Sequence, residues 1–282
     1  MTVGRIICIL IGYAIGLFQT GYIYGKTQHI DIREHGSGNA GTTNTLRTLG
    51  FKAGAITFAG DCGKAILAIF ISWLIFHEQY PEGIKLLGMY AGLGAVLGHN
   101  YPFYMKFKGG KGIACTTGVI LAFHWQMAPL CIGLFIVVVL LTQYVSLGSI
   151  LLVSVFFIEL LLFGQTGHLP VADTYLPEIY VLGGIFTLMA IWRHRANIKR
   201  LLKRCPRGIV KGVDYSAVSV EKSRRLNAEA IQRNRCVIWQ GSVQRIIFAS
   251  DWFDAVTAFE TVYFWPDLAK CFREVWRVLK PG

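Results

Sequence analysis

The chain has 282 residues, of which 54% are hydrophobic and 16% are charged, and this composition excludes an average soluble domain. The net charge of +12 is unevenly spread. Residues 1–192 hold ten Lys or Arg against eight Asp or Glu, whereas residues 193–282 hold eighteen against eight. An apolar, nearly neutral part is therefore followed by a basic C-terminal part.

Seven apolar runs predict helices that cross a bilayer, because each is long enough, or nearly so, to span its hydrocarbon core. The first has only Arg5 ahead of its core and no small-residue cleavage pattern before Lys26, so we expect a retained helix and not a signal peptide. The two shortest runs also fit re-entrant or buried helices. In chain order the runs are 3–24, 56–76, 84–98, 112–124, 128–142, 145–163 and 179–192, with 84–98 and 112–124 the shortest.

The first polar loop contains the sequence GSGNAGTTNTLR, from Gly36 to Arg47. Its small hydroxyl and amide side chains can donate hydrogen bonds to an oxyanion, and Arg47 can bind one through two parallel bonds. The alternative is a flexible loop rich in glycine, serine and asparagine. The candidate donors are Ser37, Asn39, Thr42, Thr43 and Asn44.

Few charged residues lie inside the predicted helices. Asp61 and Lys64 are three residues apart in the second helix, and we expect them to pair, with a contribution of Lys64 to an anion site as the alternative. Glu159 lies deep in the sixth helix, where an ionisable residue invites a functional interpretation. Because no nearby residue matches it, we favour a buried, hydrogen-bonded carboxyl group.

The loop at residues 98–112 reads GHNYPFYMKFKGGKG. Glycines let the backbone approach a ligand and turn its N–H groups inward, while Lys106, Lys108 and Lys111 add positive charge. This pattern predicts a site for a phosphorylated substrate, and the alternative is a solvated basic turn. His99, at the start of the loop, fits a ligand-facing group or a structural hydrogen bond at a helix end equally well.

A third polar segment, RHRAN at residues 193–197, follows the last apolar run directly. If the helix continues there, His194 and Asn197 share a face. The basic residues around them are typical anchors of a helix at a membrane surface, but neither His194 nor Asn197 is needed for anchoring. We therefore treat this pair as candidate site residues.

The distribution of basic loops predicts how the helices are oriented. Seven crossings place every basic segment on one side, which the positive-inside rule assigns to the cytoplasm. We therefore expect the N-terminus outside, and the C-terminus and all three polar segments in the cytoplasm. The basic segments are 25–52, 99–111 and the chain after 192, whereas the connections 77–83, 124–127 and 164–178 contain no Lys or Arg.

The seven cysteines are scattered, without a CxxC pair or a metal-ligand spacing with histidine. An odd number of cysteines, several of them inside apolar runs, predicts reduced packing residues. We expect neither disulfides nor a bound metal.

Together the three polar segments resemble the motifs of a known family. SGNAGTTN…R, GHNYPFYMKFKGGKG and RHRANIKRL stand in the order found in the bacterial acyl-phosphate-dependent glycerol-3-phosphate acyltransferases, the PlsY family, and the resemblance covers residues 1–204. It implies transfer of a fatty acyl group from acyl phosphate to the 1-hydroxyl of glycerol 3-phosphate, giving lysophosphatidic acid and phosphate. It also implies a multi-pass enzyme of the bacterial inner (plasma) membrane that uses no cofactor, no metal, and neither acyl-CoA nor acyl carrier protein directly.

This resemblance implies that Ser37, Arg47, His194 and Asn197 are catalytic. The proton acceptor is left open, since either His194 or the substrate phosphate can take the proton of the attacking hydroxyl. Ala40 stands where the family usually has proline, which loosens the loop but removes no reactive group. The implied substrate-binding residues are Asn39, Asn44, His99, Lys106, Gly109, Gly110, Lys111, Gly112 and, in the segment YVSL, Ser146.

The C-terminal part, residues 205–282, alternates predicted strands and helices, as doubly wound α/β folds do. From residue 208 it resembles the middle of a class I S-adenosylmethionine-dependent methyltransferase, which has a Rossmann-like fold. In that family the residue matching Asp214 bonds the cofactor ribose, and the segment matching Gly241–Val243 lies near the adenine. The stretch FDAVTAFETVYFWPD is expected to form the fourth strand and its loop.

The C-terminal part departs from the methyltransferase pattern in two ways. The glycine-rich loop expected about twenty residues before Asp214 is replaced by the third polar segment, and no later strands follow Pro281-Gly282. We therefore expect no methyltransferase activity, and an incomplete domain with uncovered strand edges. We expect it to dock on the membrane part or on another subunit, or to fold poorly, and a gene fusion or an assembly accident explains the junction near 199–208 equally well.

The sequence thus predicts an all-α polytopic membrane acyltransferase domain at residues 1–204, with about seven transmembrane helices, and a truncated methyltransferase-like α/β domain at 205–282. The expected partners are acyl phosphate, glycerol 3-phosphate and membrane lipids, without nucleic acid. Two alternatives are a phosphate-binding transporter or lipid-binding membrane protein, and a membrane-tethered methyltransferase.

Overall fold

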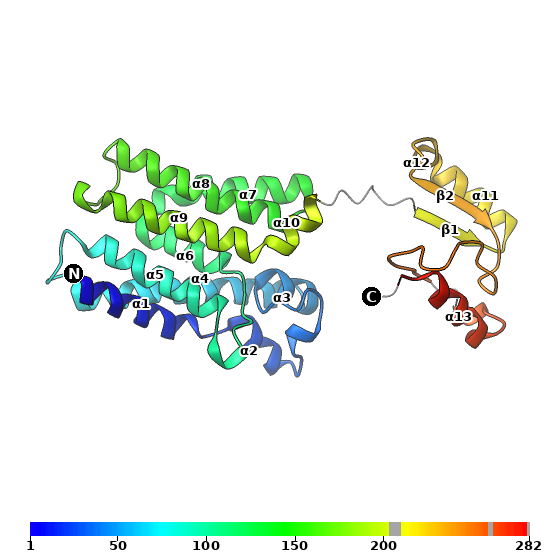
Figure 1. Ribbon diagram of the computed structural model, residues 1–282, viewed down its shortest axis with the longest axis horizontal. Coiled ribbons are helices and arrows are strands. Elements are labelled where there is room, and N and C mark those ends of the chain that lie inside the picture. Colours follow the sequence, from blue (N-terminus) through cyan, green and yellow to red (C-terminus); the bar gives the residue numbers. More distant parts are fainter. Residues whose placement is uncertain (203–209, 259–261, 281–282) are drawn as a thin grey trace. The chain divides into compact units, whose positions relative to one another are not determined.

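The structure, a computed structural model, describes residues 1–202, 210–258 and 262–280. It contains two compact units, Met1–Lys199 and Arg200–Gly282 (Figure 1). The junction expected near 199–208 lies mostly outside the described residues, as do Cys205 and the Pro281-Gly282 end. The six described cysteines are buried free thiols.

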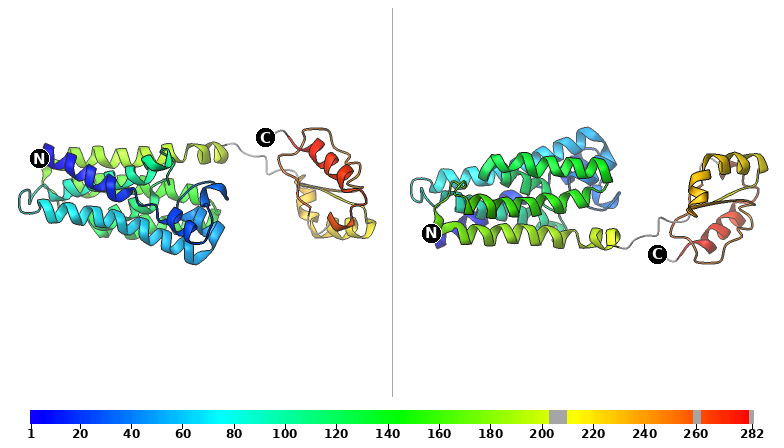
Figure 2. Two further views of the ribbon diagram at one scale, coloured as in Figure 1. Left: turned by 90° about the horizontal axis from the view of Figure 1, so that it is seen from below. Right: turned by 90° about the horizontal axis from the view of Figure 1, so that it is seen from above.

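The first unit is a bundle whose long helices run along a common axis, as Figure 2 shows from two sides. Large apolar side chains such as Leu141 and Leu188 are exposed on it, which suits contact with lipid. Pro129 and Pro177 lie in the first turns of their helices, where no helical N–H bond is lost. The helices are α1 (Thr2–Gly16), α2 (Thr20–Thr27), α3 (Thr42–Leu49), α4 (Phe51–Phe76), α5 (Ile84–Asn100), α6 (Ile113–His124), α7 (Ala128–Thr142), α8 (Val145–Gln165), α9 (Leu176–Arg193) and α10 (Arg195–Leu202), with short 3-10 turns η1 (Ile32–Glu34), η2 (Phe103–Met105), η3 (Trp125–Met127) and η4 (Asp173–Tyr175).

Five stretches of the described residues are long and apolar enough to cross a membrane. They include every predicted run except 84–98, which forms α5, a helix of 17 residues. The runs 112–124 and 128–142 fall in a single stretch of 30 residues. The five stretches are Thr2–Thr27, Phe51–Phe76, Ile113–Thr142, Val145–Gln165 and Asp173–Arg193.

The 30-residue stretch is two helices that run in opposite directions. α7 and α8 are antiparallel neighbours, and Cys131 of α7 donates from Sγ to the Glu159 carboxylate of α8 at 3.1 Å. α6 ends at His124, whose ring lies 5.7 Å from that of Phe163 near the end of α8, so α6 runs parallel to α8. The chain therefore reverses between α6 and α7, and seven helical segments run between the two ends of the bundle. The predicted buried, hydrogen-bonded carboxyl at Glu159 is confirmed.

Helices α1 and α5 pack with their backbones close together. Gly12 and Gly16 of α1 face Gly94 and Gly98 of α5, and a Cβ added to any of the four would collide with backbone atoms of the other helix. Small residues four apart are a common way for membrane helices to approach each other. The contact places Gln19, just after α1, beside the end of α5, where its Nε2 donates to the His99 carbonyl oxygen at 3.1 Å.

The second unit contains two parallel strands, paired from Val210 with Cys236 to Asp214 with Gln240. Two helices connect them, and side chains of the first helix and of β2 form a small buried cluster. This arrangement is the predicted strand–helix–strand unit of an α/β fold. The elements are β1 (Val210–Asp214), α11 (Ala217–Leu226), α12 (Ala228–Gln232), β2 (Cys236–Gln240), η5 (Val262–Phe264) and α13 (Leu268–Val278).

The strand expected in FDAVTAFETVYFWPD, residues 253–267, is not formed in its described part. Phe253 makes an isolated parallel bridge with Leu279, and the segment continues as irregular structure into η5. In the doubly wound order 3-2-1-4-5 the fourth strand pairs with the first strand. The described residues 176–202 ahead of β1 form the helices α9 and α10, so that first strand is not formed among them. Residues 259–261 of the segment lie outside the described residues.

Candidate active site

The three polar segments meet at one end of the bundle, the end of α3 and α10 (Figure 1). Asn39 of the first segment donates from Nδ2 to the Gly109 carbonyl oxygen at 3.3 Å. Lys111 of the second donates from Nζ to Oδ1 of Asn197 in the third at 2.6 Å. Segments about seventy and eighty residues apart in the chain are thus joined directly by side chains of the predicted site residues.

The first loop is held together by Asn44. Its buried Oδ1 accepts hydrogen bonds from the backbone N–H of Ser37 at 2.8 Å and from the Ser37 hydroxyl at 3.2 Å. Its Nδ2 donates to the carbonyl oxygens of Ile32 and His35 at 2.9 and 3.0 Å. The Asn44 amide is therefore used for folding the loop, while Ser37 remains exposed at its surface.

The predicted cations of the first two loops are open to solvent. Arg47, in the last turn of α3, and Lys106 and Lys108 have exposed side chains with no hydrogen bond or ion pair to the described residues. Lys106 and its neighbour Phe107 adopt left-handed backbone conformations, with φ of 53° and 58°. Non-glycine residues rarely adopt this conformation, and it turns the chain sharply just before the glycines.

The glycines of the second loop do not use their N–H groups as the sequence predicted. The N–H of Gly109 donates to the Asn100 carbonyl oxygen at 3.2 Å, and that of Gly110 donates to the His99 carbonyl oxygen at 3.0 Å. The expected phosphate cradle is therefore wrong for these two N–H groups, which are satisfied by the end of α5. Gly112, with φ of +81°, immediately precedes α6, whose first N–H groups have no partner within the helix.

Arg193 is a residue of this site that the sequence interpretation missed. Its Nη2 donates to the carbonyl oxygens of Gly109 at 2.9 Å and Gly110 at 2.6 Å, and its guanidinium lies 5.1 Å from the Tyr101 ring centroid. These hydrogen bonds hold the loop at residues 98–112, called the glycine loop below, against the end of α9. The available signal was its place directly before His194, but basic residues at helix ends are too common to single it out.

His194 lies at the break between α9 and α10 and is buried. Its Nδ1 donates to the Ala190 carbonyl oxygen at 2.8 Å, so Nε2 carries the lone pair. Burial lowers the pKa of His194 to about 4, against the opposing effect of the Ala190 hydrogen bond and with smaller lowering effects of Lys111 and Arg193. The ring is therefore neutral near pH 7.

Two other predicted residues lie apart from these contacts. Ser146 is half-buried in the first turn of α8 and makes no hydrogen bond with the three segments among the described residues. Asp214 ends β1 in the second unit, where its Oδ1 accepts from the Ser216 N–H at 2.8 Å and its carbonyl oxygen accepts from the Gly241 N–H at 2.9 Å.

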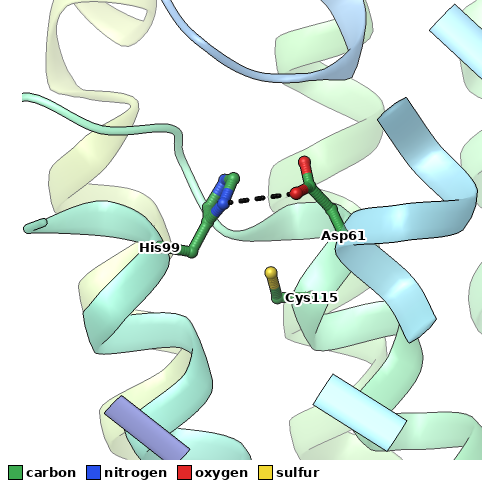
Figure 3. Close-up of side chains that lie close together, drawn as sticks. All are labelled: Asp61, His99 and Cys115. Carbon is green, nitrogen blue, oxygen red and sulfur yellow. Dashed lines mark ion pairs between the residues drawn. The ribbon is translucent and has the colours of Figure 1, made fainter. Parts of the chain in front are cut away.

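A buried group behind the glycine loop contains Asp61, His99 and Cys115 (Figure 3), whose side-chain ligand atoms lie within 4.8 Å of one another. Lys64 is also there, and its Nζ lies 3.0 Å from Asp61 Oδ1 and 2.9 Å from His99 Nδ1. A metal ion would have to compete with this ammonium group for the same atoms. The predicted pairing of Asp61 with Lys64 is confirmed.

Comparisons with known proteins cover both units. A family described as "Glycerol-3-phosphate acyltransferase" matches residues 6–204, and one described as "Methyltransferase domain" matches residues 189–282. Glycerol-3-phosphate acyltransferases of Alkaliphilus metalliredigens and Bacillus subtilis are 42% and 40% identical to this chain, each over 70% of it and over 92% and 93% of their own lengths. A crystal structure of PlsY, an integral membrane glycerol 3-phosphate acyltransferase in its glycerol 3-phosphate form, matches with a TM-score of 0.60 and 32% identity over 70% of this chain and 92% of that one.

Proposed function

Because this chain belongs to the glycerol-3-phosphate acyltransferase family, we propose that its first unit transfers an acyl group from acyl phosphate to the 1-hydroxyl of glycerol 3-phosphate. The chain is a PlsY-type glycerol-3-phosphate acyltransferase that produces lysophosphatidic acid, and it is an integral, multi-pass membrane protein. Acyl phosphate as the donor is the added proposal. The predicted family and fold class are confirmed.

The observation that carries the proposal is the meeting of the three polar segments at one end of the bundle. Two phosphorylated substrates that react with each other repel, so a catalyst needs several cations and N–H donors on the same side. Arg47, Lys106 and Lys108 are exposed and unpaired among the described residues, and the start of α6 adds backbone donors. We assign these groups to the two phosphates.

In the proposed reaction, the 1-hydroxyl oxygen of glycerol 3-phosphate attacks the acyl carbon and forms the new ester bond. The bond between that carbon and the phosphate oxygen breaks, and phosphate leaves with the electron pair. The hydroxyl proton goes to a base. Because the leaving group is already a stable anion, the step needs orientation and charge neutralisation more than a strong protein base.

The lowered pKa of His194 favours the substrate phosphate as proton acceptor. An imidazole whose pKa is about 4 is a weaker base than a phosphate monoester, whose second pKa is about 6. The lone pair on Nε2 is suited to accept a hydrogen bond from the attacking hydroxyl and so to orient it. Asn197, held by Lys111, lies one helical turn beyond it.

We also propose that this end of the bundle faces the cytoplasm. The basic segments 25–52, 99–111 and 193–199 are all at that end, and the connections at the opposite end contain no Lys or Arg. The reversal between α6 and α7 supports this orientation, because it keeps the glycine loop on the same side as the other two segments.

The deciding experiment is an assay of the purified full chain with palmitoyl phosphate and glycerol 3-phosphate. Equimolar release of phosphate and lysophosphatidic acid is expected, and palmitoyl-CoA in place of palmitoyl phosphate is expected to give no product. Turnover with palmitoyl-CoA alone would contradict the proposed donor. Absence of turnover with both donors would favour a transporter or a lipid-binding protein.

For the second unit we propose no methyl transfer. Its parallel strands and the position of Asp214 at the end of β1 favour a nucleoside-binding ancestry. However, the described residues that precede β1 in the family match, 189–202, belong to α9, α10 and the acyltransferase motif. They are therefore not available as a glycine-rich loop for the methionine part of the cofactor.

A further inference from the structure

The buried group of Asp61, Lys64 and His99 is not used by the proposed reaction, yet it directly adjoins the glycine loop. All three side chains are almost completely buried, with exposed fractions of 1%, 6% and 2%. Asp61 and Lys64 come from α4 and His99 from the end of α5 (Figure 3 shows Asp61 and His99). Moving charged groups out of water costs free energy of folding. The buried Asp61–Lys64 ion pair beside the glycine loop is therefore a candidate for a functional role.

The Lys64 ammonium has three protons and three acceptors. Its Nζ lies 2.5 Å from the Phe18 carbonyl oxygen, 3.0 Å from Asp61 Oδ1 and 2.9 Å from His99 Nδ1. Thr20 adds a hydroxyl that donates to the same Asp61 oxygen at 3.1 Å, which supports the carboxylate form opposite the ammonium. Lys64 therefore has no proton left for a substrate anion, which excludes its predicted alternative role in the anion site.

An ammonium group that donates to Nδ1 of His99 fixes the state of that ring. Nδ1 must carry the lone pair, so the neutral ring carries its proton on Nε2. The Nε2 edge lies against Gly110, where an added Cβ would collide with it. The His99 carbonyl oxygen meanwhile accepts the Gly110 N–H at 3.0 Å and the Gln19 amide at 3.1 Å. The ring is thus held with a single N–H at the edge that adjoins Gly110.

We propose that Asp61 and Lys64 are positioning residues that hold His99 in its Nε2–H form, so that this N–H donates to a phosphoryl oxygen of the glycerol 3-phosphate bound at the glycine loop. The assignment rests on the proposed function. Because the Lys64 ammonium donates to Nδ1 of His99, the Nε2–H bond of the neutral ring is polarised and is a better donor to an anion. The positive charge of Lys64 itself stays paired with Asp61. Arg193, the other cation that contacts the loop, donates from Nη2 to the carbonyl oxygens of Gly109 and Gly110, while its buried Nε has no hydrogen-bond partner among the described residues.

The first test removes the ammonium without leaving a buried charge. The double variant Asp61→Asn/Lys64→Met is expected to raise the KM for glycerol 3-phosphate about tenfold, since an oriented bond to a charged group is lost, and to change kcat less than about threefold. The matched control is Arg5→Met/Glu178→Gln, which removes an ion pair of 2.6 Å between α1 and α9, with the same change in charge but no contact with the glycine loop. The control is expected to leave KM unchanged.

Replacement of His99 separates positioning from plain structural support. His99→Gln keeps a donor at the ε position and has no tautomers, whereas His99→Asn offers a donor only at the δ position. We expect His99→Gln to stay within about threefold of the unmodified KM and His99→Asn to lose about tenfold. Added to His99→Gln, the Asp61→Asn/Lys64→Met pair is expected to have no further effect on KM. A structural role would instead predict additive losses.

A direct readout does not depend on activity. In full chain labelled with ¹⁵N-histidine, with the His99→Gln spectrum used for assignment, the His99 ring is expected to show a protonated Nε2 and an unprotonated Nδ1. The double variant is expected to show both tautomers. An Nδ1–H or doubly protonated ring in the unmodified protein would overturn the inference, as would an unchanged KM in a folded double variant. If the unmodified chain lacks acyltransferase activity, the proposed function fails while the ring spectrum still tests the tautomer.

Discussion

His194 shows how a single residue can be fixed in one chemical state by the end of a helix. Its Nδ1 proton is held by the Ala190 carbonyl oxygen of the last turn of α9, and burial keeps the ring neutral. A neutral acceptor with a fixed direction is suited to hold a hydroxyl in place, but it is poorly suited to retain a proton at pH 7.

The variant His194→Gln tests this distinction. We expect it to lower kcat for glycerol 3-phosphate at least about tenfold, because the hydroxyl is no longer oriented, and to leave the pH midpoint of kcat/KM near 6, where the substrate phosphate titrates. The measurement is a pH profile of both proteins between pH 5 and 8. Loss or displacement of that midpoint in the variant would identify His194 as the titrating base, and retention of most activity would remove it from the catalytic group.

The same residue also makes stability depend on pH. Because the pKa of His194 is lowered from 6.5 to about 4 on folding, its neutral form contributes fully above pH 6.5, and the contribution is lost as the pH falls toward 4. The thermal midpoint of the unmodified protein should therefore fall more steeply between pH 6.5 and 4 than that of His194→Gln. Equal slopes would contradict the lowered pKa.

The sequence predicts an individual site residue only where its side-chain chemistry distinguishes binding a ligand from folding a loop. Lys111 and Asn197 were both predicted as site residues, and the structure joins them by a hydrogen bond. Asn44 and the N–H groups of Gly109 and Gly110 were assigned to substrate but fold their own loops. A donor that binds a ligand and a donor that closes a loop have the same side chain and the same local pattern, so the sequence does not separate them.

At the scale of helices, the close contact between the glycines of α1 and α5, called the seam below, determines where the glycine loop begins. The backbones approach through Gly12, Gly16, Gly94 and Gly98, and the approach brings Gln19 to the His99 carbonyl oxygen. Nothing in the apolar runs indicated that the first and third helices pack together, because hydropathy reports burial and length but not partners.

Gly94→Leu tests the seam. Its side chain would collide with the backbone of Ile9 and Tyr13, so we expect a loss of stability of about 2 kcal/mol or more, together with reduced activity. Gly133→Leu in α7 is the matched control, because a Cβ there meets nothing within 4 Å. Thermal unfolding in the same detergent compares the two, and equal midpoints would contradict a tight seam.

The helices themselves were largely predictable, since each apolar run coincides with a helix or a helix pair. Two features were missed. The first run is interrupted between α1 and α2, and the polar stretch TTNTLRTL forms α3 and not an irregular loop. A short helix of Thr and Asn has weak intrinsic helix preference, so its formation depends on contacts with α4 and on the Asn44 bonds that hold the preceding loop.

At the scale of the whole molecule, the two units bear on function separately. All three motif segments lie in residues 1–199, so a chain ending at Arg204 is expected to retain kcat/KM for glycerol 3-phosphate within about twofold of the full chain. The assay described above, run on both at equal protein concentration, measures this. A loss of activity at unchanged thermal midpoint would show that the second unit takes part in catalysis.

Titration of the full chain with S-adenosylmethionine accompanies that comparison. No saturable binding is expected, because the residues ahead of β1 belong to the acyltransferase motif. Saturable binding that disappears in Asp214→Ala would instead establish a cofactor site in the second unit.

The glycine seam also constrains how the protein is made. The partners Gly12 and Gly94 are about eighty residues apart in the chain, and at about 5–20 residues per second α1 waits several seconds in the bilayer before α5 is synthesised. During that time it must persist as a lone helix whose small-residue face meets only lipid or the insertion machinery. Co-translational insertion should therefore complete the catalytic end only after the seventh helical segment, α9, and the polar segment that follows it have emerged. Slow translation before residue 100 would prolong the exposure of α1 to wrong partners.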